Sequence, residues 1–135
     1  MTQCVFCKIV KGELPSLILE ETADFLCLLP IDMECFGHTL IVPKQHYADV
    51  ASAPAVIGQG IFQCAQTLSQ QFGEKFGAMG FNLLNANGIV AEQSVPHLHF
   101  HFLPRREGDG ITAWPPLPGA SEDRQVFWQR YRGAI

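Results

Sequence analysis

Charged side chains are scarce in this chain of 135 residues, since 16% are charged, compared with about 25% in typical soluble domains. The 9 basic and 13 acidic residues leave a net charge of −4, so no overall positive field attracts a nucleic-acid backbone. No stretch approaches the roughly 18 apolar residues of a membrane helix, and the N-terminus lacks a basic segment followed by a long apolar run. We therefore expect a cytoplasmic protein without nucleic-acid or membrane partners.

Apolar residues are by contrast abundant, at 47%. A chain of about this length forms one domain and buries roughly two-thirds of its unfolded surface, so it builds a core without disulfide bonds. The apolar content also predicts that part of the surface meets a second subunit. The 5 cysteines, an odd number without a secretory signal, indicate reduced thiols or a metal site rather than a disulfide framework.

The pattern of apolar residues predicts both helices and strands. One long helix is predicted with Ser52 as its N-cap and Pro54 in its first turn, ending near Gly73 and Gly77. Short helices are predicted at residues 4–11 and after Ser121. A polar loop at 85–94 and a proline-rich irregular segment at 114–119 complete the chain. The predicted strands are runs of apolar residues at 17–19, 25–29, 38–42, 81–84 and 95–103.

A row of three histidines lies in the last predicted strand. Because successive strand side chains point to opposite faces, His97, His99 and His101 share one face, and the apolar residues between them form a floor on the other. Three interpretations are open. The row can consist of half-buried imidazoles with hydrogen-bond partners, or of ligands in a catalytic metal centre with Glu92 as the nearest upstream carboxylate. It can also perform phosphoryl or nucleotidyl transfer, in which one neutral imidazole attacks phosphorus while its other nitrogen keeps a hydrogen.

The residues around the row favour phosphoryl transfer. Asn85 and Asn87, followed by Gln93 and Ser94, place amides and a hydroxyl on the loop that enters the strand, where they can hold phosphate oxygens. Two arginines at 105 and 106 follow the strand and can bind further phosphate oxygens. Each of these residues alone is equally typical of a solvated loop, so the argument rests on their grouping.

Several segments are spaced as in one known family. They are His-x-His-x-His with two apolar residues after it, Gln93-Ser94-Val95 before it, Leu103-Pro104-Arg105 behind it, the segment 37–44 upstream, and Cys4-x-x-Cys7-Lys8-Ile9. Together they resemble the bacterial histidine-triad (HIT) proteins over roughly residues 4–105. The resemblance implies an α+β fold with a five-stranded antiparallel sheet, one long helix and one or two short helices. It also implies a homodimer with a continuous sheet, and a single HIT domain at 1–135 with a core at 4–105 and a C-terminal extension at 106–135.

The resemblance implies catalysis at the α-phosphate of nucleoside phosphoramidates or dinucleoside polyphosphates. His99 is similar in position to the family's nucleophile, which forms a nucleotidyl-histidine intermediate that water then cleaves. His101 would contact the transferred phosphate or the leaving group, and His38 would support the pair from a neighbouring strand. Ser94 would act at the leaving group and is counted with the catalytic residues.

The implied ligand is a purine nucleotide or an AMP-like conjugate. By resemblance, Asn85 and Asn87 lie in the nucleotide-facing loop, and Gln93 and Ser94 contact phosphate and leaving group. His99 and His101 contact the phosphate as well.

The same resemblance implies a role for the N-terminal cysteines. In zinc-bearing bacterial members the ligands are Cys4, Cys7, the histidine after the Val-Pro-Lys segment, here His46, and the first triad histidine, here His97. The resemblance therefore implies structural zinc, with no metal needed for catalysis. The remaining cysteines are expected to be small buried residues: Cys27, Cys35 and Cys64.

Three positions depart from the family pattern. Many members bind ribose with an aspartate eight residues before the His38 equivalent, where this chain has Pro30. Asp32 lies on the same face if the segment is extended and is expected to replace it. Glu92 stands at a usual glycine, where its charge repels phosphate unless it points outward, and Ala86 replaces a frequent Asn or Gln. These departures keep an alternative open: a nucleotide-binding, zinc-stabilised interaction protein with weak or vestigial catalysis.

Overall fold

The computed structural model describes residues 3–133, which form one five-stranded sheet and three α-helices. The strands lie in the order β1-β2-β3-β5-β4, and every neighbouring pair is antiparallel. This confirms the predicted α+β fold with one long helix and one or two short ones, of which the structure has two. In chain order the elements are α1 (Val5–Val10), β1 (Ile18–Glu21), β2 (Phe25–Leu28), β3 (Thr39–Pro43), α2 (Ile57–Phe76), β4 (Gly80–Asn85), β5 (Phe100–Arg105) and α3 (Arg124–Tyr131).

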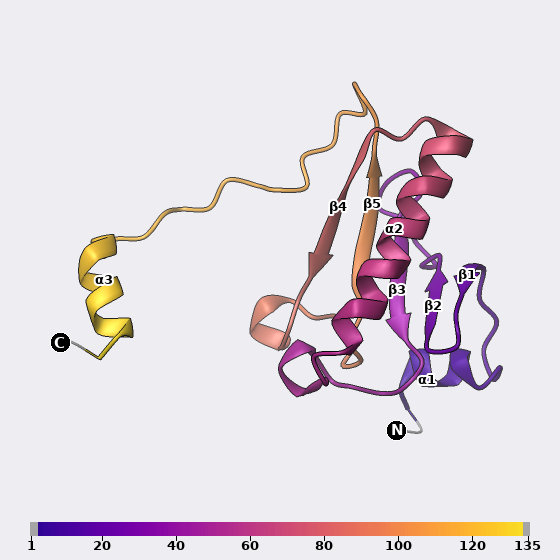
Figure 1. Cartoon of the computed structure of the whole chain (residues 1–135), viewed down its shortest axis with the longest axis horizontal. Helices are drawn as coiled ribbons and strands as arrows, with labels where there is room; N and C mark the ends of the chain where they lie inside the picture. The colour runs from indigo at the N-terminus through magenta and orange to yellow at the C-terminus, as the bar shows by residue number, and fades with distance from the viewer. Residues whose placement is uncertain (1–2, 134–135) are drawn as a thin grey trace.

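Helix α2 crosses one face of the sheet (Figure 1). Its apolar residues recur at helical spacing, and the buried ones form the main core with sheet residues such as Phe25, Ile41 and Phe102. Gly60 lies against the ring of Phe25 and leaves no room for a side chain, whereas Gly58 has nothing within 4 Å. Cys27 and Cys64 belong to this core, as expected, whereas Cys35 is only partly buried.

The opposite face of the sheet is covered by α1. Since alternate strand residues point to opposite faces, Leu26, Leu28, Leu40 and Val42 form a second cluster there, and Cys4 and Phe6 pack against it. The helix is short because Gly12, at φ +78°, ends it one turn after the second cysteine. The N-terminal cysteines are thereby held against the sheet.

The long helix begins later than predicted. Ser52 is not its N-cap but the last residue of a separate 3-10 turn, η1 (Val50–Ser52), which is capped by Asp49. The Asp49 carboxylate accepts from the Ser52 N–H at 3.0 Å, and the Ser52 hydroxyl accepts from the Asp49 N–H at 3.3 Å. Helix α2 starts only at Ile57, beyond Pro54, so Pro54 lies outside its first turn. The predicted end is confirmed by Gly77, which adopts φ +71°.

The histidine strand is also shorter than predicted. It begins at Phe100 rather than at 95, and only its residues 100–102 pair with β3. Upstream of it, Leu98 donates its N–H at 2.7 Å to the carbonyl of Tyr47, outside the sheet. His97 and His99 therefore precede the strand, although the predicted apolar floor remains, with Leu98 and Phe102 both in the main core.

The C-terminal extension leaves the sheet as an irregular segment that includes the prolines at 115, 116 and 118, as predicted. Helix α3 follows, at a distance from the sheet (Figure 1), and none of its residues is buried. Its N-cap is Asp123, which accepts from Gln125 and Val126, so the predicted cap at Ser121 is wrong by two residues. Between residues 3 and 133, no helix combines the length and apolar character required to cross a membrane.

Candidate active site and metal cluster

His99 has two ring nitrogens in different surroundings. The side chain is 5% exposed, and its Nδ1 lies 2.8 Å from the carbonyl oxygen of His97. A carbonyl only accepts, so Nδ1 carries a hydrogen, and in the uncharged ring the lone pair lies on Nε2. No side chain or backbone group of residues 3–133 hydrogen-bonds this Nε2. The uncharged form of His99 therefore carries its lone pair on a nitrogen that no described group of the protein occupies.

His38 and His101 form a second hydrogen-bonded pair. The backbone N–H of Glu34 donates to His38 Nδ1 at 3.1 Å, which leaves the hydrogen of His38 on Nε2. This Nε2–H donates to His101 Nδ1 at 2.9 Å, so the hydrogen of His101 lies on its Nε2. The rings of His101 and His99 are 5.1 Å apart between centroids. A lone pair on one ring and an N–H on the other are thus carried by neighbouring side chains.

Burial keeps this cluster neutral. Burial, together with the smaller effects of the nearby His99 and His38, lowers the pKa of His101 to about 4. Burial also lowers the pKa of His38. At pH 7 both rings are therefore uncharged, which agrees with the hydrogen positions that their partners require.

Asn85 contacts the backbone of the nucleophile candidate, and Asn87 contacts Asn85. Asn85 donates from Nδ2 to the carbonyl of His99 at 3.0 Å and accepts from the amide of Asn87. Asn87 in turn accepts from the Val50 N–H at 2.8 Å. Asn85 thus links the end of β4 to the backbone of His99, and Asn87 links Asn85 to η1. Their contacts with a nucleotide remain predictions.

Gln93 holds the loop before the histidines in place. Its Oε1 accepts from the Gly88 N–H at 2.7 Å, and its Nε2 donates to the carbonyls of Ala48 at 2.7 Å and Val95 at 2.9 Å. A phosphate contact from this amide would have to replace one of these bonds. Ser94, by contrast, is exposed and lines a hollow of about 690 Å³ beside Cys4 and His46.

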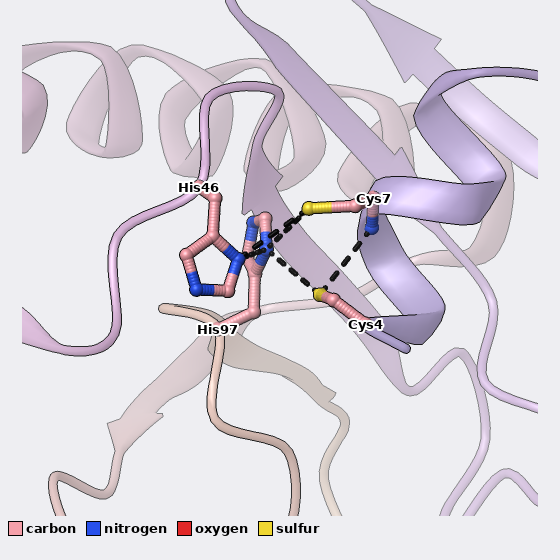
Figure 2. A group of neighbouring side chains, drawn as sticks. All are labelled: Cys4, Cys7, His46 and His97. Carbon is pink, nitrogen blue, oxygen red and sulfur yellow. Dashed lines mark hydrogen bonds between the residues drawn. The ribbon is translucent and has the colours of Figure 1, made fainter. Parts of the chain in front are cut away.

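The four predicted metal ligands converge (Figure 2). One ligand atom from each of Cys4, Cys7, His46 and His97 lies within 4.8 Å of all the others. The Nε2–H of His97 donates to the Pro43 carbonyl at 2.9 Å, so its Nδ1 lone pair faces the cluster.

The spacing suits a tetrahedral ion. Bonds of about 2.0–2.3 Å place the corners of a zinc tetrahedron about 3.3–3.8 Å apart. In this cluster His97 Nδ1 lies 3.3 Å from Cys4 Sγ, 3.7 Å from Cys7 Sγ and 3.0 Å from His46 Nδ1. Two sulfur and two imidazole donors are a set that zinc prefers. We call these four residues the Cys2His2 cluster, and they fit a structural zinc ion.

Comparison with known proteins decides the family, because residues 11–108 match the model of the HIT domain. The chain belongs to the histidine-triad (HIT) family. An uncharacterised HIT-like protein of Methanocaldococcus jannaschii is 40% identical over 111 residues, which cover 79% of this chain and 82% of that protein. An adenosine 5'-monophosphoramidase of Schizosaccharomyces pombe is 35% identical over 134 residues, 98% of either chain. A zinc-bound histidine triad protein of Mycobacterium smegmatis has a similar structure, with a TM-score of 0.78, 34% identity and coverage of 98% of this chain and 93% of that one.

Two departures from the HIT pattern are visible in the structure. Residues 31–37 form bends and a turn, so the extended geometry that would place Asp32 on the same face as Pro30 is not present, and Asp32 is exposed. Glu92 has φ +69° and is the one non-glycine residue at positive φ within residues 3–133. A glycine at this position adopts the left-handed conformation without strain, which accounts for the usual residue of the family. The Glu92 side chain is exposed.

Arg105 is not free to bind phosphate, because its guanidinium is bonded within the protein. Its guanidinium bonds both carboxylate oxygens of Asp109, at 2.8 and 2.9 Å, as well as Asn82 and the Ile111 carbonyl. The pKa of Asp109 is far below its usual range because of these bonds. Arg106 stacks over the ring of Phe36 at 4.0 Å. A phosphate contact from Arg105 would therefore displace Asp109.

Several groups that shape the site were not found from the sequence. The Glu34 N–H and the carbonyls of Pro43 and His97 fix which nitrogen of each histidine carries hydrogen. Backbone groups are present at every residue, so no sequence pattern identifies them. Phe6 could have been found, because its position between the two cysteines of the metal motif is visible in the sequence. Its ring packs against two of the histidines.

Proposed function

We propose that this HIT protein is a nucleotide hydrolase that acts at the α-phosphate of nucleoside phosphoramidates or dinucleoside polyphosphates. The observation that carries the proposal is the bond from His99 Nδ1–H to the His97 carbonyl, because it leaves the Nε2 lone pair free for phosphorus. The 35% identity to an adenosine 5'-monophosphoramidase over nearly the whole chain supports the substrate class. An AMP-like purine nucleotide is the proposed ligand.

The reaction proceeds in two displacements. In the first, the Nε2 lone pair of His99 forms a bond to the α-phosphorus as the bond to the leaving nitrogen or oxygen breaks, giving a nucleotidyl-histidine. In the second, water attacks the phosphorus, the bond to His99 breaks, and the nucleoside monophosphate is released. His101 donates a hydrogen bond from Nε2–H to a phosphate oxygen as negative charge shifts during each step.

The remaining polar residues bind the substrate in this proposal. Ser94 donates a hydrogen bond to the leaving group, which departs with a proton from solvent, and the water of the second displacement returns one proton to solvent. Gln93 binds phosphate, and Asn85 and Asn87 face the nucleotide. Asp32 is the carboxylate proposed to bind the ribose hydroxyls.

The Cys2His2 cluster holds structural zinc in this proposal, and no step of the reaction uses a metal. Bound zinc would link α1 to the loops that carry His46 and His97 and so stabilise the fold. The protein is further proposed to act in the cytoplasm as a homodimer. The sheet would continue into the second subunit along β4, the longer of its two edge strands, with six residues compared with four in β1.

Turnover of adenosine phosphoramidate and of diadenosine tetraphosphate tests the proposal. We expect His99→Ala to lose at least about 1,000-fold in kcat while still binding AMP, because the nucleophile is removed. His99→Asn is the matched control, since its amide can still donate to the His97 carbonyl but has no nucleophilic nitrogen, and we expect the same loss. Mass spectrometry of the wild type quenched during turnover should detect a nucleotidylated protein. If the wild type binds AMP but hydrolyses neither compound, the hydrolase proposal is refuted and the alternative of a nucleotide-binding interaction protein takes its place.

A further inference from the structure

Phe6 touches the proposed nucleophile, although nothing in the reaction requires an aromatic side chain there. It is the second residue of α1 and is 5% exposed. Its ring centroid lies 5.2 Å from that of His99 with an interplanar angle of 62°, and 5.5 Å from that of His97 with an angle of 78°. One side chain therefore packs against both a metal ligand and the proposed nucleophile.

These contacts have the geometry of aromatic pairs. Aromatic rings attract one another when the edge of one approaches the face of another at centroid separations of about 4.5–7 Å. Both angles at Phe6 fall into this edge-to-face class. An aliphatic residue of similar volume would fill the same space without this directional preference, so Phe6 favours one orientation of each imidazole.

The ring of His99 needs such a restraint. A single hydrogen bond, from Nδ1 to the His97 carbonyl, holds the ring, while Asn85 holds only the backbone carbonyl of His99. The other flank of the ring is His101, at 5.1 Å and 64°. The direction of the Nε2 lone pair is thus set by one hydrogen bond and by the aromatic contacts with Phe6 and His101.

We propose that Phe6 is a positioning residue that aims the Nε2 lone pair of His99 at the substrate phosphorus. The expected effect of Phe6 on the reaction rate rests on the proposed function. Its expected effect on the orientation of the His99 imidazole rests on the structure alone. Phe6 is itself firmly placed, because it lies between the two cysteines of the Cys2His2 cluster and packs with Leu26 and Leu40 on the sheet. The nucleophile is therefore oriented from α1, a helix that contributes no reacting atom.

The competing explanation is that Phe6 only fills the second core. Phe25 provides the matched control, because it is 4% exposed and belongs to the core on the other face of the sheet, away from the histidines. Phe6→Ala and Phe25→Ala both remove a buried aromatic ring and leave a cavity. Only the first removes a neighbour of His99.

The experiment measures kcat and KM for adenosine phosphoramidate, together with the imidazole ¹⁵N signals of His99 in the full chain. For Phe6→Ala we expect kcat to fall about 10- to 100-fold, since small errors in position cost this much, with KM changed less than about threefold. The separate Nδ1–H and Nε2 signals of His99 should move toward an average as the ring loses its fixed orientation. Phe6→Leu should recover part of kcat, and Phe25→Ala should keep both kcat and the signals of the wild type.

An unchanged kcat and unchanged His99 signals in Phe6→Ala, with a stability loss like that of Phe25→Ala, would overturn the proposal. If Phe6→Ala does not fold, Phe6→Leu decides alone, since wild-type kcat and wild-type signals in that variant would also overturn it. A wild type without turnover would refute the proposed function but not the positioning, because the ¹⁵N signals still report whether Phe6 fixes the ring.

Discussion

Replacing Glu92 by glycine should make this protein more stable. Glu92 has φ +69°, and a residue with a Cβ loses about 1–2 kcal/mol in the left-handed conformation. Glycine avoids this strain but gives the unfolded chain more freedom, which costs about 0.5–1 kcal/mol. The difference is a net gain of about 0.5–1 kcal/mol in the free energy of unfolding. With an unfolding entropy of about 2.1 cal/mol/K per residue over the 135 residues, this gain raises Tm by about 2–4 °C.

Urea and thermal unfolding of four proteins test this reasoning: the wild type, Glu92→Gly, Glu92→Asn and Glu92→Ala. Alanine removes the carboxylate but keeps a Cβ, so it should gain nothing over the wild type. Asparagine tolerates the left-handed region better than most residues and should lie between alanine and glycine. If alanine stabilises as much as glycine, the effect comes from charge and the backbone argument is refuted.

Three further predictions concern the helix, the metal cluster and the buried imidazoles. Gly60→Ala should destabilise the fold by about 1–3 kcal/mol because its methyl group overlaps the buried ring of Phe25, whereas Gly58→Ala should stabilise it by about 0.5–1 kcal/mol; equal effects in urea unfolding would contradict this. Chelation should lower Tm, and free Zn²⁺ at about 100 times its Kd should raise the free energy of unfolding by about 2.7 kcal/mol. Mg²⁺ should not raise it, because thiolates and imidazoles are poor ligands for that ion. A Tm that responds neither to chelation nor to Zn²⁺ would argue against a structural metal. The pKa of His101 is lowered from 6.5 to about 4, so between these values the unfolded chain binds more protons and the free energy of unfolding falls as the pH falls. Between pH 7 and pH 5 we expect His101 to lower the free energy of unfolding by about 1 kcal/mol, after allowance for the partial exposure of its side chain. If His101→Asn shows the same pH dependence as the wild type, the lowered pKa does not belong to His101.

The fold could be predicted where local pattern and tertiary packing agree. The helical spacing of Ile61, Leu68 and Phe72 predicts the buried face of α2, and the structure places these residues in the core. The start of α2 could not be predicted, because Ser52 carries a capping signal that serves the preceding 3-10 turn. The start of β5 was missed because Leu98 bonds to Tyr47, a partner far away in the sequence.

The candidate site divides in the same way. The resemblance to HIT proteins, carried by cysteine and histidine positions visible in the sequence, was sufficient to predict that Cys4, Cys7, His46 and His97 converge. The distribution of hydrogens over the imidazoles depends on backbone groups that every residue possesses. Only the folded chain shows which carbonyl or N–H each ring meets.

The bond from the Glu34 N–H to His38 has a consequence for the movement of protons. A backbone amide is neither an acid nor a base near pH 7, so the chain from Glu34 through His38 to His101 is closed at its inner end. A proton that leaves His101 through Nε2 therefore cannot be replaced from the protein interior and has to return through the same atom. In the proposed reaction His101 therefore serves as a hydrogen-bond donor that keeps its proton, and the proton balance is closed between the attacking water and the leaving group.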